Sequence, residues 1–271
     1  MILVTGASGR LASLTLAALT AQSAPAVGGS RTPGAGQRHL DLDDPDSLDL
    51  AGVATLVLVS AGYAEDDRVV ARHRAAVDAA VRDGVRHVVY TSLTGAGDHL
   101  GFALAHRVTE SVVRESGLPW TILRNGLYAE LFGSLLTWTA DGIESAFGAG
   151  ALAAVARADL AAAVAVVAAS PAAHAGKTYE LVGRPVDAEA VAARLGVVHH
   201  DIGLGEYRAR LLADSTLLPF QPPMLTSIAS CVRHGLLGAT GTDLQELLGT
   251  PLTDALAVAA STAAAGRPRG R

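Results

Sequence analysis

The 271-residue sequence contains one cysteine, one lysine and few aromatic side chains. The single cysteine, Cys231, excludes an intrachain disulfide and any metal site built from several cysteines, and such usage is typical of a reducing compartment. The adjacent histidines His199 and His200 do not form a metal site either, because neighbouring residues of a strand point to opposite faces. Aromatic residues make up 4% of the chain although apolar residues make up 50%. Alanine and valine supply the difference, so we expect closely packed helices and no bound metal.

An excess of positive charge and an unbroken apolar segment are also absent. Lysine and arginine number 21 against 26 acidic residues, and the formal net charge of −5 offers no basic surface that would attract nucleic acid. The most membrane-like run, residues 151–169, is interrupted by Arg157 and Asp159. The N-terminus is read as a core strand rather than as a signal peptide. We therefore expect a cytoplasmic protein, monomeric or homodimeric, with neither nucleic acid nor a membrane as partner.

The first residues of the chain place a glycine turn between a strand and a helix. An apolar run, Met1–Thr5, is followed by Gly6, Gly9 and Ala12, and an alanine-rich helical pattern continues to about Ala21. Gly6 permits a sharp turn, Gly9 lets backbone N–H groups approach a phosphate, and Ala12 allows close packing of helix on strand. The helix N-terminus then offers free donors to a diphosphate. The pattern predicts a dinucleotide site, the alternative being a tight turn without a ligand.

The residue that selects between NADP and NAD is expected at Arg31. It follows a weak second strand that begins at Pro25, about 20 residues after the glycines, where an acidic residue would bind the ribose of NAD and an arginine the 2′-phosphate of NADP. No acidic residue lies between the glycine turn and Arg31. A guanidinium suits a phosphate, so NADP(H) is favoured as the cofactor. Arg10 could serve instead, and Asp41, which ends the next strand-like run, is placed to face the adenine ring.

Strand and helix patterns alternate over the first 125 residues. Apolar runs predict strands at 55–60, 87–92 and 120–124, and helical spacing predicts helices at 66–82 and 102–115. This alternation is typical of the α/β class, specifically a Rossmann-like, doubly wound parallel sheet. The length suffices for one large domain together with a small one.

The pattern loosens beyond residue 130. We expect a helix at 131–140, a loop at 142–150, a helix at 159–170 and a strand at 177–182. Short helices at 187–195, 206–213, about 224–232 and 243–248 and one strand at 197–202 are expected to follow. The predicted organisation is an NADP-binding Rossmann domain at 1–130, a lid with a shared helix and strand that complete the sheet at 131–185, and a small, mostly helical C-terminal subdomain on the substrate side at 186–271.

Ligands of such sheets bind where the parallel strands end. In this sequence the strand ends and the residues after them, besides Gly6 and Arg31, are Ser60, Ala61, Gly62, Thr91, Ser92, Leu93 and Asn125 to Tyr128. These positions are candidates for contact with the ribose and the nicotinamide.

One kind of catalytic pair is missing. Lys177 is the only lysine, and Ala173 stands four residues before it, so the Tyr-x-x-x-Lys pair of ordinary short-chain dehydrogenases is not present. That pair protonates a weakly electrophilic carbonyl through an activated tyrosine. Either the substrate accepts a hydride without a strong general acid, or the protein binds the cofactor without turnover.

Quinones fit the first alternative, because aromatisation drives their reduction and one donor to the developing oxyanion suffices. The candidate donor is His106, at the start of the helix after the fifth strand; the alternative is a partly exposed helix histidine. Glu110, on the same helix face, is expected either to hold the imidazole or to be solvated. Tyr63, Tyr90 and Tyr128 are further candidate donors, although Tyr90 is better explained as a core residue.

Segments spread over nearly the whole chain carry a family pattern. They are Gly6–Gly9, Tyr90–Leu93, residues 105–110 with 116–121, residues 123–130, residues 157–159 with 177–183, and residues 247–253. Together they resemble the NmrA-like, atypical short-chain dehydrogenase group, and within it the bacterial type 2 NAD(P)H:quinone oxidoreductases. The sequence departs from that pattern at Ala12, at Leu127 and in a short 147–156 segment.

The resemblance implies an NADPH-binding Rossmann domain and a quinone held between it and a small C-terminal domain. It implies cofactor contacts at Gly6, Ser8, Gly9, Arg10, Leu11, Arg31, residues 60–62 and residues 91–93. In plant reductases of the same superfamily a lysine stands where His106 falls, which supports a His106 that faces the nicotinamide.

The predicted function is that of an NAD(P)H-dependent quinone oxidoreductase that passes a hydride from NADPH to a small quinone. His106 and Tyr128 are the catalytic candidates, and His106 and Asn125 are also expected to contact the cofactor. Two alternatives remain open: a non-catalytic NADP(H)-binding redox sensor of the NmrA type, and a reductase of an enone or imine in a specialised pathway.

Overall fold

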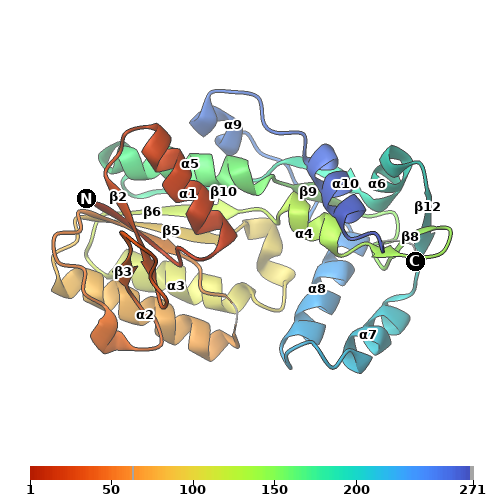
Figure 1. Cartoon of the computed structure of the whole chain (residues 1–271), viewed down its shortest axis with the longest axis horizontal. Helices are drawn as coiled ribbons and strands as arrows, with labels where there is room; N and C mark the ends of the chain where they lie inside the picture. Colours follow the sequence, from red (N-terminus) through yellow and green to blue (C-terminus); the bar gives the residue numbers. More distant parts are fainter. Residues whose placement is uncertain (63, 269–271) are drawn as a thin grey trace.

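The computed structural model describes residues 1–62 and 64–268. A central sheet of parallel strands occupies one half of the molecule (Figure 1). Its strands, from one edge to the other, are β10 (Lys177–Leu181), β6 (Trp120–Asn125), β5 (His87–Leu93), β4 (Thr55–Val59), β1 (Ile2–Thr5), β2 (Ala26–Ser30) and β3 (Arg38–His39). Every neighbouring pair is parallel. The predicted Rossmann-like, doubly wound sheet is confirmed.

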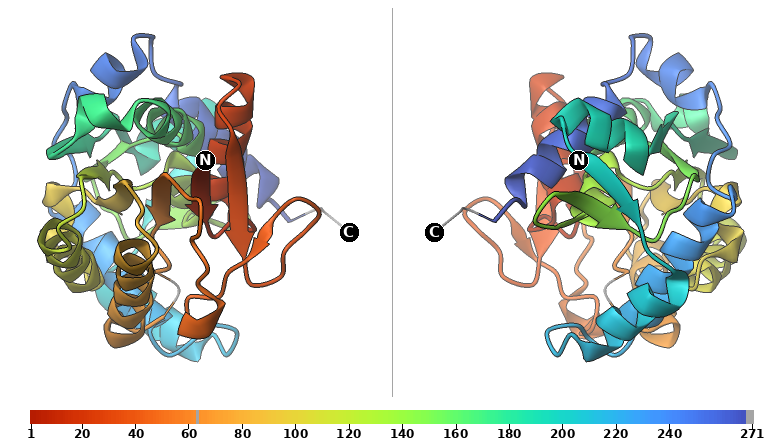
Figure 2. Two further views of the ribbon diagram at one scale, coloured as in Figure 1. Left: turned by 90° about the vertical axis from the view of Figure 1, so that its left-hand side faces the viewer. Right: turned by 90° about the vertical axis from the view of Figure 1, so that its right-hand side faces the viewer.

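Helices cover both faces of this sheet (Figures 1 and 2). One face carries α1 (Arg10–Ala21) and α5 (Arg157–Ala169), which share a core with Val4, Val57 and Leu123. The opposite face carries α2 (Asp66–Arg82) and α3 (Ala103–Glu115), packed on alternate residues of the same strands. Strands buried on both faces must be apolar throughout, which explains why their continuous apolar runs were visible in the sequence.

The chain reverses its direction of winding at β1, which has β2 on one side and β4 on the other. The loops that leave these strands at their carboxyl ends therefore diverge and leave a crevice above the sheet. This crevice holds the glycine turn.

The other half of the molecule is a smaller assembly of helices and short strands (Figure 1). Its first elements are α4 (Ala129–Ser134), β7 (Thr137–Trp138), β8 (Gly142–Ser145) and β9 (Ala151–Ala154). After β10 follow β11 (Arg184–Asp187), α6 (Ala188–Leu195), β12 (Val198–Asp201), α7 (Leu204–Ala213), α8 (Gln221–Arg233), α9 (Asp243–Leu248) and α10 (Ala255–Ala265). Three 3-10 turns, at Pro45–Ser47, Gly95–His99 and Pro171–His174, complete the described part of the chain.

Two of the last helices pack far from each other. The helix α9 returns to the Rossmann half and packs on α5 and β10, and Asp243 accepts the backbone N–H of Glu180 over 2.8 Å. By contrast, α10 packs on α4 and α6. Gly133 permits this contact, because a Cβ atom there would collide with the Ala259 carbonyl.

Two predictions for residues 131–150 are wrong. The expected helix at 131–140 ends at Ser134, and Thr137–Trp138 form β7. The expected loop at 142–150 begins with β8, which pairs with β7 and with β12. Pairing with a strand more than fifty residues further along the chain overrides the weak local preference of this segment. Two strands, β9 and β11, and the helix α10 were not predicted.

None of the described helices is long and apolar enough to cross a membrane.

Candidate active site

The glycine corner has the geometry that the sequence predicted. Gly6 follows β1 with a φ of +65°, a conformation that favours glycine. The N–H of Gly9 donates to the Gly6 carbonyl over 2.7 Å, and a Cβ atom at Gly9 would lie 3.1 Å from that oxygen. Gly9 is the N-cap of α1, and among the described residues no side chain caps this helix. The N–H groups of the first turn therefore face the crevice without an acceptor in the described part of the chain.

A cavity of about 560 Å³ opens beside this corner, a volume usual for small-molecule sites. Predicted cofactor residues form most of its wall: Gly6, Ser8, Gly9, Arg10, Leu11, Arg31, Asp41, Ser60, Ala61 and Gly62. Tyr128, predicted as catalytic, also lines it. We call this space the main cavity.

Free positive charge lines the main cavity. Arg10 and Arg31 are exposed and, within the described residues, their guanidinium groups form no ion pair or hydrogen bond. Asp43 and Arg72 line the same space, but they bind each other through two hydrogen bonds of 2.9 and 2.7 Å. The hydrogen bond from Arg72, joined by one from Arg68, lowers the pKa of Asp43 to about 2. The carboxylate of Asp43 is thus compensated, and Arg10 and Arg31 remain available to an anion.

Tyr128 is held from one side by an arginine. The guanidinium of Arg157 lies over its ring, 4.4 Å from the centroid, and Glu130 approaches that guanidinium to 3.6 Å. Glu130 also accepts the backbone N–H of Arg157 and so caps α5. Burial raises the pKa of Tyr128, so its phenol keeps its proton at neutral pH and can donate it in a hydrogen bond.

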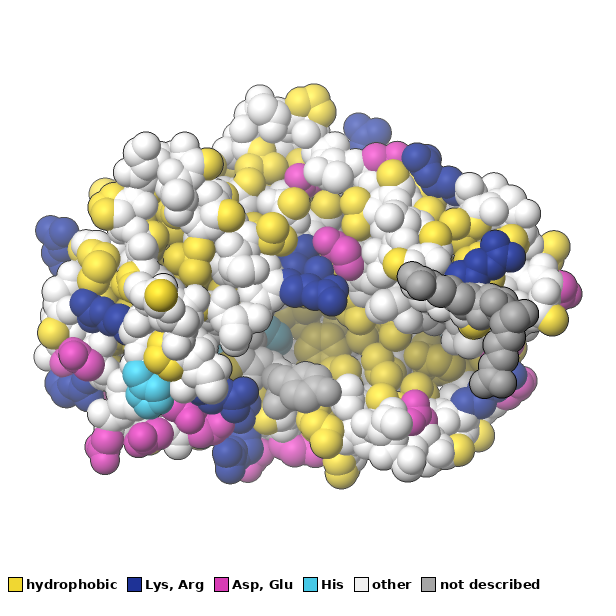
Figure 3. Space-filling model, viewed as in Figure 1, with side chains coloured by type: hydrophobic (Ala, Val, Ile, Leu, Met, Phe, Trp, Pro, Cys, Tyr) yellow, Lys and Arg dark blue, Asp and Glu magenta, His cyan; other side chains and the backbone are white. Residues whose placement is uncertain are grey.

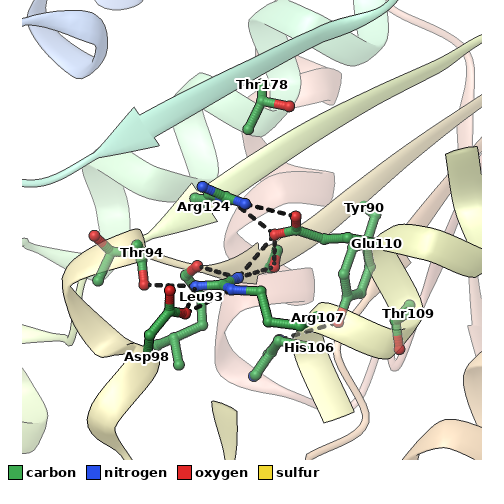
Figure 4. Close-up of polar contacts among 12 residues, drawn as sticks. Tyr90, Leu93, Thr94, Asp98, His106, Arg107, Thr109, Glu110, Arg124 and Thr178 are labelled. Carbon is green, nitrogen blue, oxygen red and sulfur yellow. Dashed lines mark hydrogen bonds and ion pairs between the residues drawn. The ribbon is translucent and has the colours of Figure 1, made fainter. Parts of the chain in front are cut away.

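His106 lies on α3 against Tyr90 (Figure 4). Its Nδ1 is 3.0 Å from the Tyr90 hydroxyl. Burial, with a further contribution from the charge of Arg107, lowers the pKa of His106 to about 4, so the imidazole is neutral at pH 7. Burial also raises the pKa of Tyr90, so the phenol keeps its proton and can donate it to Nδ1. In that tautomer the proton of the imidazole is on Nε2, which has no hydrogen-bond partner in the described structure.

Several predicted residues lie outside the wall of the main cavity. The hydroxyl of Thr91 accepts the N–H of Ser60, and the Ser92 hydroxyl binds Glu110 on the other face of the sheet. Leu93 packs in the core of the C-terminal half. Asn125 is 6% exposed and its Oδ1 has no partner among the described residues, as is also true of Ser60 Oγ. Contact of these residues with the cofactor stays a prediction, and Tyr63 lies outside the described residues.

The role expected of Glu110 is wrong. Its carboxylate neither holds His106 nor is solvated: it is 1% exposed and binds Arg107, Arg114 and Arg124 at 2.8 to 3.0 Å (Figure 4). Arg107 also donates to the carbonyl groups of Leu93 and Thr94, at the start of the loop after β5. Helical spacing placed Glu110 near His106, but it could not show that Arg124 from β6, together with Arg107 and Arg114 of α3 itself, would bind its carboxylate.

Sequence reasoning did not assign cavity roles to Arg72 or Arg157. Nothing local marks Arg72 within a long amphipathic helix. Arg157 did carry a signal, because it occupies the first turn of α5, where the helix dipole disfavours a positive charge. An arginine in that position is more understandable if it faces an anion.

A hollow with hydrophobic side chains on its floor opens between the two halves of the molecule, with Lys or Arg side chains on its rim (Figure 3). A small cavity of about 160 Å³, lined by Phe102, Phe220 and Met224 among others, meets the main cavity at Gly62. Phe102 stacks edge-on against His106 with centroids 6.4 Å apart. Among the described residues no cluster of His, Cys, Asp or Glu could hold a metal ion.

The residues present fit a nicotinamide dinucleotide. The helix after the glycine turn, which no described side chain caps, suits a diphosphate, and the free arginines suit a further phosphate. Fold and site together define a dinucleotide-binding protein of the Rossmann class.

Comparison with known proteins gives the family. The NAD(P)H-binding family matches residues 6–171. Quinone oxidoreductase 2 of Escherichia coli is 37% identical over an alignment of 199 positions that covers 68% of this chain and 68% of that protein. An NmrA-like family domain-containing oxidoreductase of Aspergillus flavus is 34% identical over an alignment of 155 positions that covers 50% of each chain. A (4-alkanoyl-5-oxo-2,5-dihydrofuran-3-yl)methyl phosphate reductase of Streptomyces griseus is 30% identical over an alignment of 284 positions that covers 93% of this chain and 94% of that protein.

The fold is also similar to that of solved structures. A crystal structure of NADPH-dependent quinone oxidoreductase from Escherichia coli, complexed with NADPH, superposes with a TM-score of 0.83 at 29% identity and covers 96% of this chain and 99% of that one. The chain belongs to the NAD(P)H-binding family and, within it, to the NmrA-like oxidoreductases that include quinone oxidoreductase 2. The predicted family and the predicted nicotinamide dinucleotide cofactor are confirmed.

Proposed function

We propose that this protein is an NADPH-dependent reductase of small quinones. The observation that carries the proposal is the placement of His106: a neutral imidazole whose Nδ1 lies 3.0 Å from the Tyr90 hydroxyl and whose Nε2 has no hydrogen-bond partner among the described residues. We assign the Tyr90 proton to this contact, which leaves the imidazole proton on Nε2. His106 stands in a protein that lacks the Tyr-x-x-x-Lys pair, since Lys177 is the only lysine. Neutral hydrogen-bond donors suit an acceptor whose reduction needs little acid catalysis.

When bound, NADPH supplies the hydride. The role of the protein is then to place the acceptor and to stabilise the charge that develops on its oxygen. The Nε2–H of His106 is the proposed donor to that oxygen, and the Tyr128 phenol, fixed by Arg157, is the second. Because the pKa of His106 is only about 4, the imidazole donates a hydrogen bond at neutral pH without giving up a proton. Water supplies the proton that completes the hydroquinone.

Arg31 supports NADPH over NADH. It lines the main cavity just after β2, it is exposed, and within the described residues no acidic side chain neutralises it. Arg10 adds a second free cation to the same wall. Two free guanidinium groups suit the extra phosphate of NADPH.

The test follows NADPH consumption by the purified protein with and without 1,4-benzoquinone. Boiled protein is the blank, because quinones react spontaneously with reductants. We expect His106→Ala to lower kcat by about 100-fold, the usual effect of losing one oxyanion donor, while the Kd of NADPH changes less than about threefold. The matched control is His99→Ala, an exposed histidine on the loop before α3, which should retain the wild-type rate. A wild-type rate for His106→Ala would remove this role.

One relative favours a second acceptor class, because the Streptomyces griseus protein is named as the reductase of an unsaturated furanone. Hydride addition to a conjugated double bond also develops charge on a carbonyl oxygen, so the same donors would serve. The acceptor panel should therefore include an unsaturated lactone. Tight NADPH binding with no oxidation by any acceptor would instead indicate a redox sensor.

A further inference from the structure

His73 is a buried histidine that connects the loop after β4 with α3. Its side chain is 0% exposed. The backbone N–H of Ala61 donates to its Nε2 over 2.9 Å, and its Nδ1 lies 2.8 Å from the Thr109 hydroxyl. Ala61 belongs to the wall of the main cavity, and Thr109 belongs to the helix that carries His106. His73 therefore contacts the cofactor wall on one side and the helix of the candidate donor on the other.

The positions of the protons in the contacts among Ala61, His73 and Thr109 follow from the hydrogen-bond partner of each atom. A backbone N–H only donates, so Nε2 of His73 accepts and carries no proton. Burial lowers the pKa of His73 to about 3, so the neutral ring carries its proton on Nδ1. That N–H donates to the Thr109 hydroxyl, whose own proton goes to the Ala105 carbonyl over 2.7 Å. Both ring nitrogens are satisfied, which fixes the tautomer and the orientation of the ring.

The same ring supports Tyr90. The two rings meet edge to face with centroids 5.4 Å apart, and the Tyr90 hydroxyl in turn binds His106 (Figure 4). The residue that orients His106 is thus packed on the residue that holds Ala61.

We propose that His73 is a positioning residue: its Nε2 holds the Ser60–Gly62 wall in the shape that receives the cofactor, and its Nδ1–H locks that wall to α3. In the described structure the Ala61 N–H has no other acceptor. Without His73 this N–H would lose its acceptor and the loop would shift at Ala61, although the Ser60 N–H and the Ala61 carbonyl would keep their hydrogen bonds to Thr91 and Arg72. His73 itself touches neither cofactor nor acceptor.

Two substitutions at this position separate its polar role from its packing role. His73→Phe keeps an aromatic ring of similar size against Tyr90 and removes both hydrogen bonds. We expect it to raise the Kd of NADPH by about tenfold, the effect of one unpaired buried N–H. His73→Gln can return an amide oxygen to the place of Nε2, so it should restore the Kd to within about threefold of wild type.

A second buried histidine provides the matched control. His87 on β5 is 4% exposed and binds the Thr121 hydroxyl over 2.9 Å, but it does not line the main cavity. His87→Phe should lower the Tm and leave the Kd of NADPH unchanged. If His73→Phe raises the Kd no more than His87→Phe does, or if His73→Gln gives no rescue, His73 is only a structural histidine and the proposal is wrong.

Two readouts do not depend on His73→Phe being folded. Thr109→Val removes the acceptor of Nδ1 and spares the Ala61 bond, so it should raise the Kd of NADPH by less than about threefold. A rise as large as that of His73→Phe would show that the contact with α3, and not the Ala61 bond, shapes the cofactor wall, and would contradict the proposal. Nitrogen NMR of the unaltered protein should find His73 protonated on Nδ1 alone, and a proton on Nε2 would overturn the assignment. Because these measurements use cofactor affinity and the tautomer, they stand or fall separately from quinone reduction.

Discussion

Replacing Glu110 by glutamine would remove a buried negative charge and keep nearly the same shape. The carboxylate is 1% exposed and accepts hydrogen bonds from Ser92, Arg107, Arg114 and Arg124 at 2.7 to 3.0 Å. It joins α3 to β5 and β6, directly beside the helix turn of His106 (Figure 4). Loss of this carboxylate should therefore weaken the packing of α3, which carries His106, on β5 and β6.

The magnitude follows from the pKa. Burial by itself would raise the pKa of Glu110, but the hydrogen bonds from Arg124 and Ser92 and the charges of Arg124 and Arg107 bring it from 4.5 to about 2. Lowering the pKa of Glu110 from 4.5 to about 2 corresponds to about 3 kcal/mol of stability at neutral pH. Breaking a buried ion pair costs on the order of 3–5 kcal/mol. Because Arg107 keeps Asp98 and Arg124 keeps Glu180, we expect the lower end, about 3 kcal/mol.

The direction in which folding shifts the pKa of Glu110 determines how the stability depends on pH. A carboxyl whose pKa is lowered by folding contributes stability above its unfolded pKa of 4.5, and that contribution disappears as the pH falls toward its folded pKa of about 2. The wild-type protein should therefore lose about 3 kcal/mol of unfolding free energy between about pH 5 and about pH 2 through this group. The Glu110→Gln variant lacks this contribution at every pH, so its unfolding free energy should depend less on pH in that range.

Urea unfolding, followed by circular dichroism and by tryptophan fluorescence, measures both quantities at neutral pH and at about pH 3. Glu115→Gln, an exposed position at the end of the same helix, is the control and should change the unfolding free energy by less than about 0.5 kcal/mol. A difference between wild type and Glu110→Gln that is the same at both pH values would refute the reasoning, since the charge would then not be the cause.

Two further predictions concern the cofactor. Arg31→Asp should raise the Kd of NADPH by about 100-fold, because a charge-assisted contact is replaced by repulsion, while the Kd of NADH changes less than about threefold; equal loss for both would show that Arg31 does not meet the 2′-phosphate. Gly9→Val should raise the Kd of either cofactor by more than about tenfold, because a branched side chain at the N-cap of α1 would cover the N–H groups expected to meet the diphosphate. Its Cβ would also lie 3.1 Å from the Gly6 carbonyl oxygen, so some loss of Tm is expected as well. Unchanged affinity, measured by titration calorimetry, would remove the phosphate-turn assignment.

The central sheet could be predicted because its information is local. Strands buried on both faces are written as continuous apolar runs, and glycine or proline separates them from the helices. The helix α2 spans the predicted residues, Asp66–Arg82, and α9 spans Asp243–Leu248 as expected. The predictions for residues 131–150 were wrong for the opposite reason, because the structure of this segment depends on distant contacts. There β8 exists because Gly142 to Ser145 pair with Val198 to Asp201, and that partner is far away in the sequence.

The residues of the candidate site fall into the same two groups: those that a local pattern predicts and those that only the tertiary structure brings together. The glycine corner and Arg31 could be read directly, because each follows a strand end and the carboxyl ends of parallel strands meet at one edge of the sheet. Arg72 and Asp43 could not be paired in advance, since their contact depends on how α2 lies across the loop after β3. Helical spacing gave Glu110 and His106 a common face, yet the two side chains bind different partners.

The sequence by itself determined that a strand, a glycine turn and a helix form the opening corner, because the conformation of that corner depends on consecutive residues and on the absence of a Cβ atom at two of them. The tertiary structure alone decided which polar groups meet behind it. Ala61 and His73 are 12 residues apart, His73 and Thr109 are 36 apart, and Tyr90 and His106 are 16 apart. Hydrogen bonds between side chains of separate elements exist only once those elements are packed, and no local pattern records them.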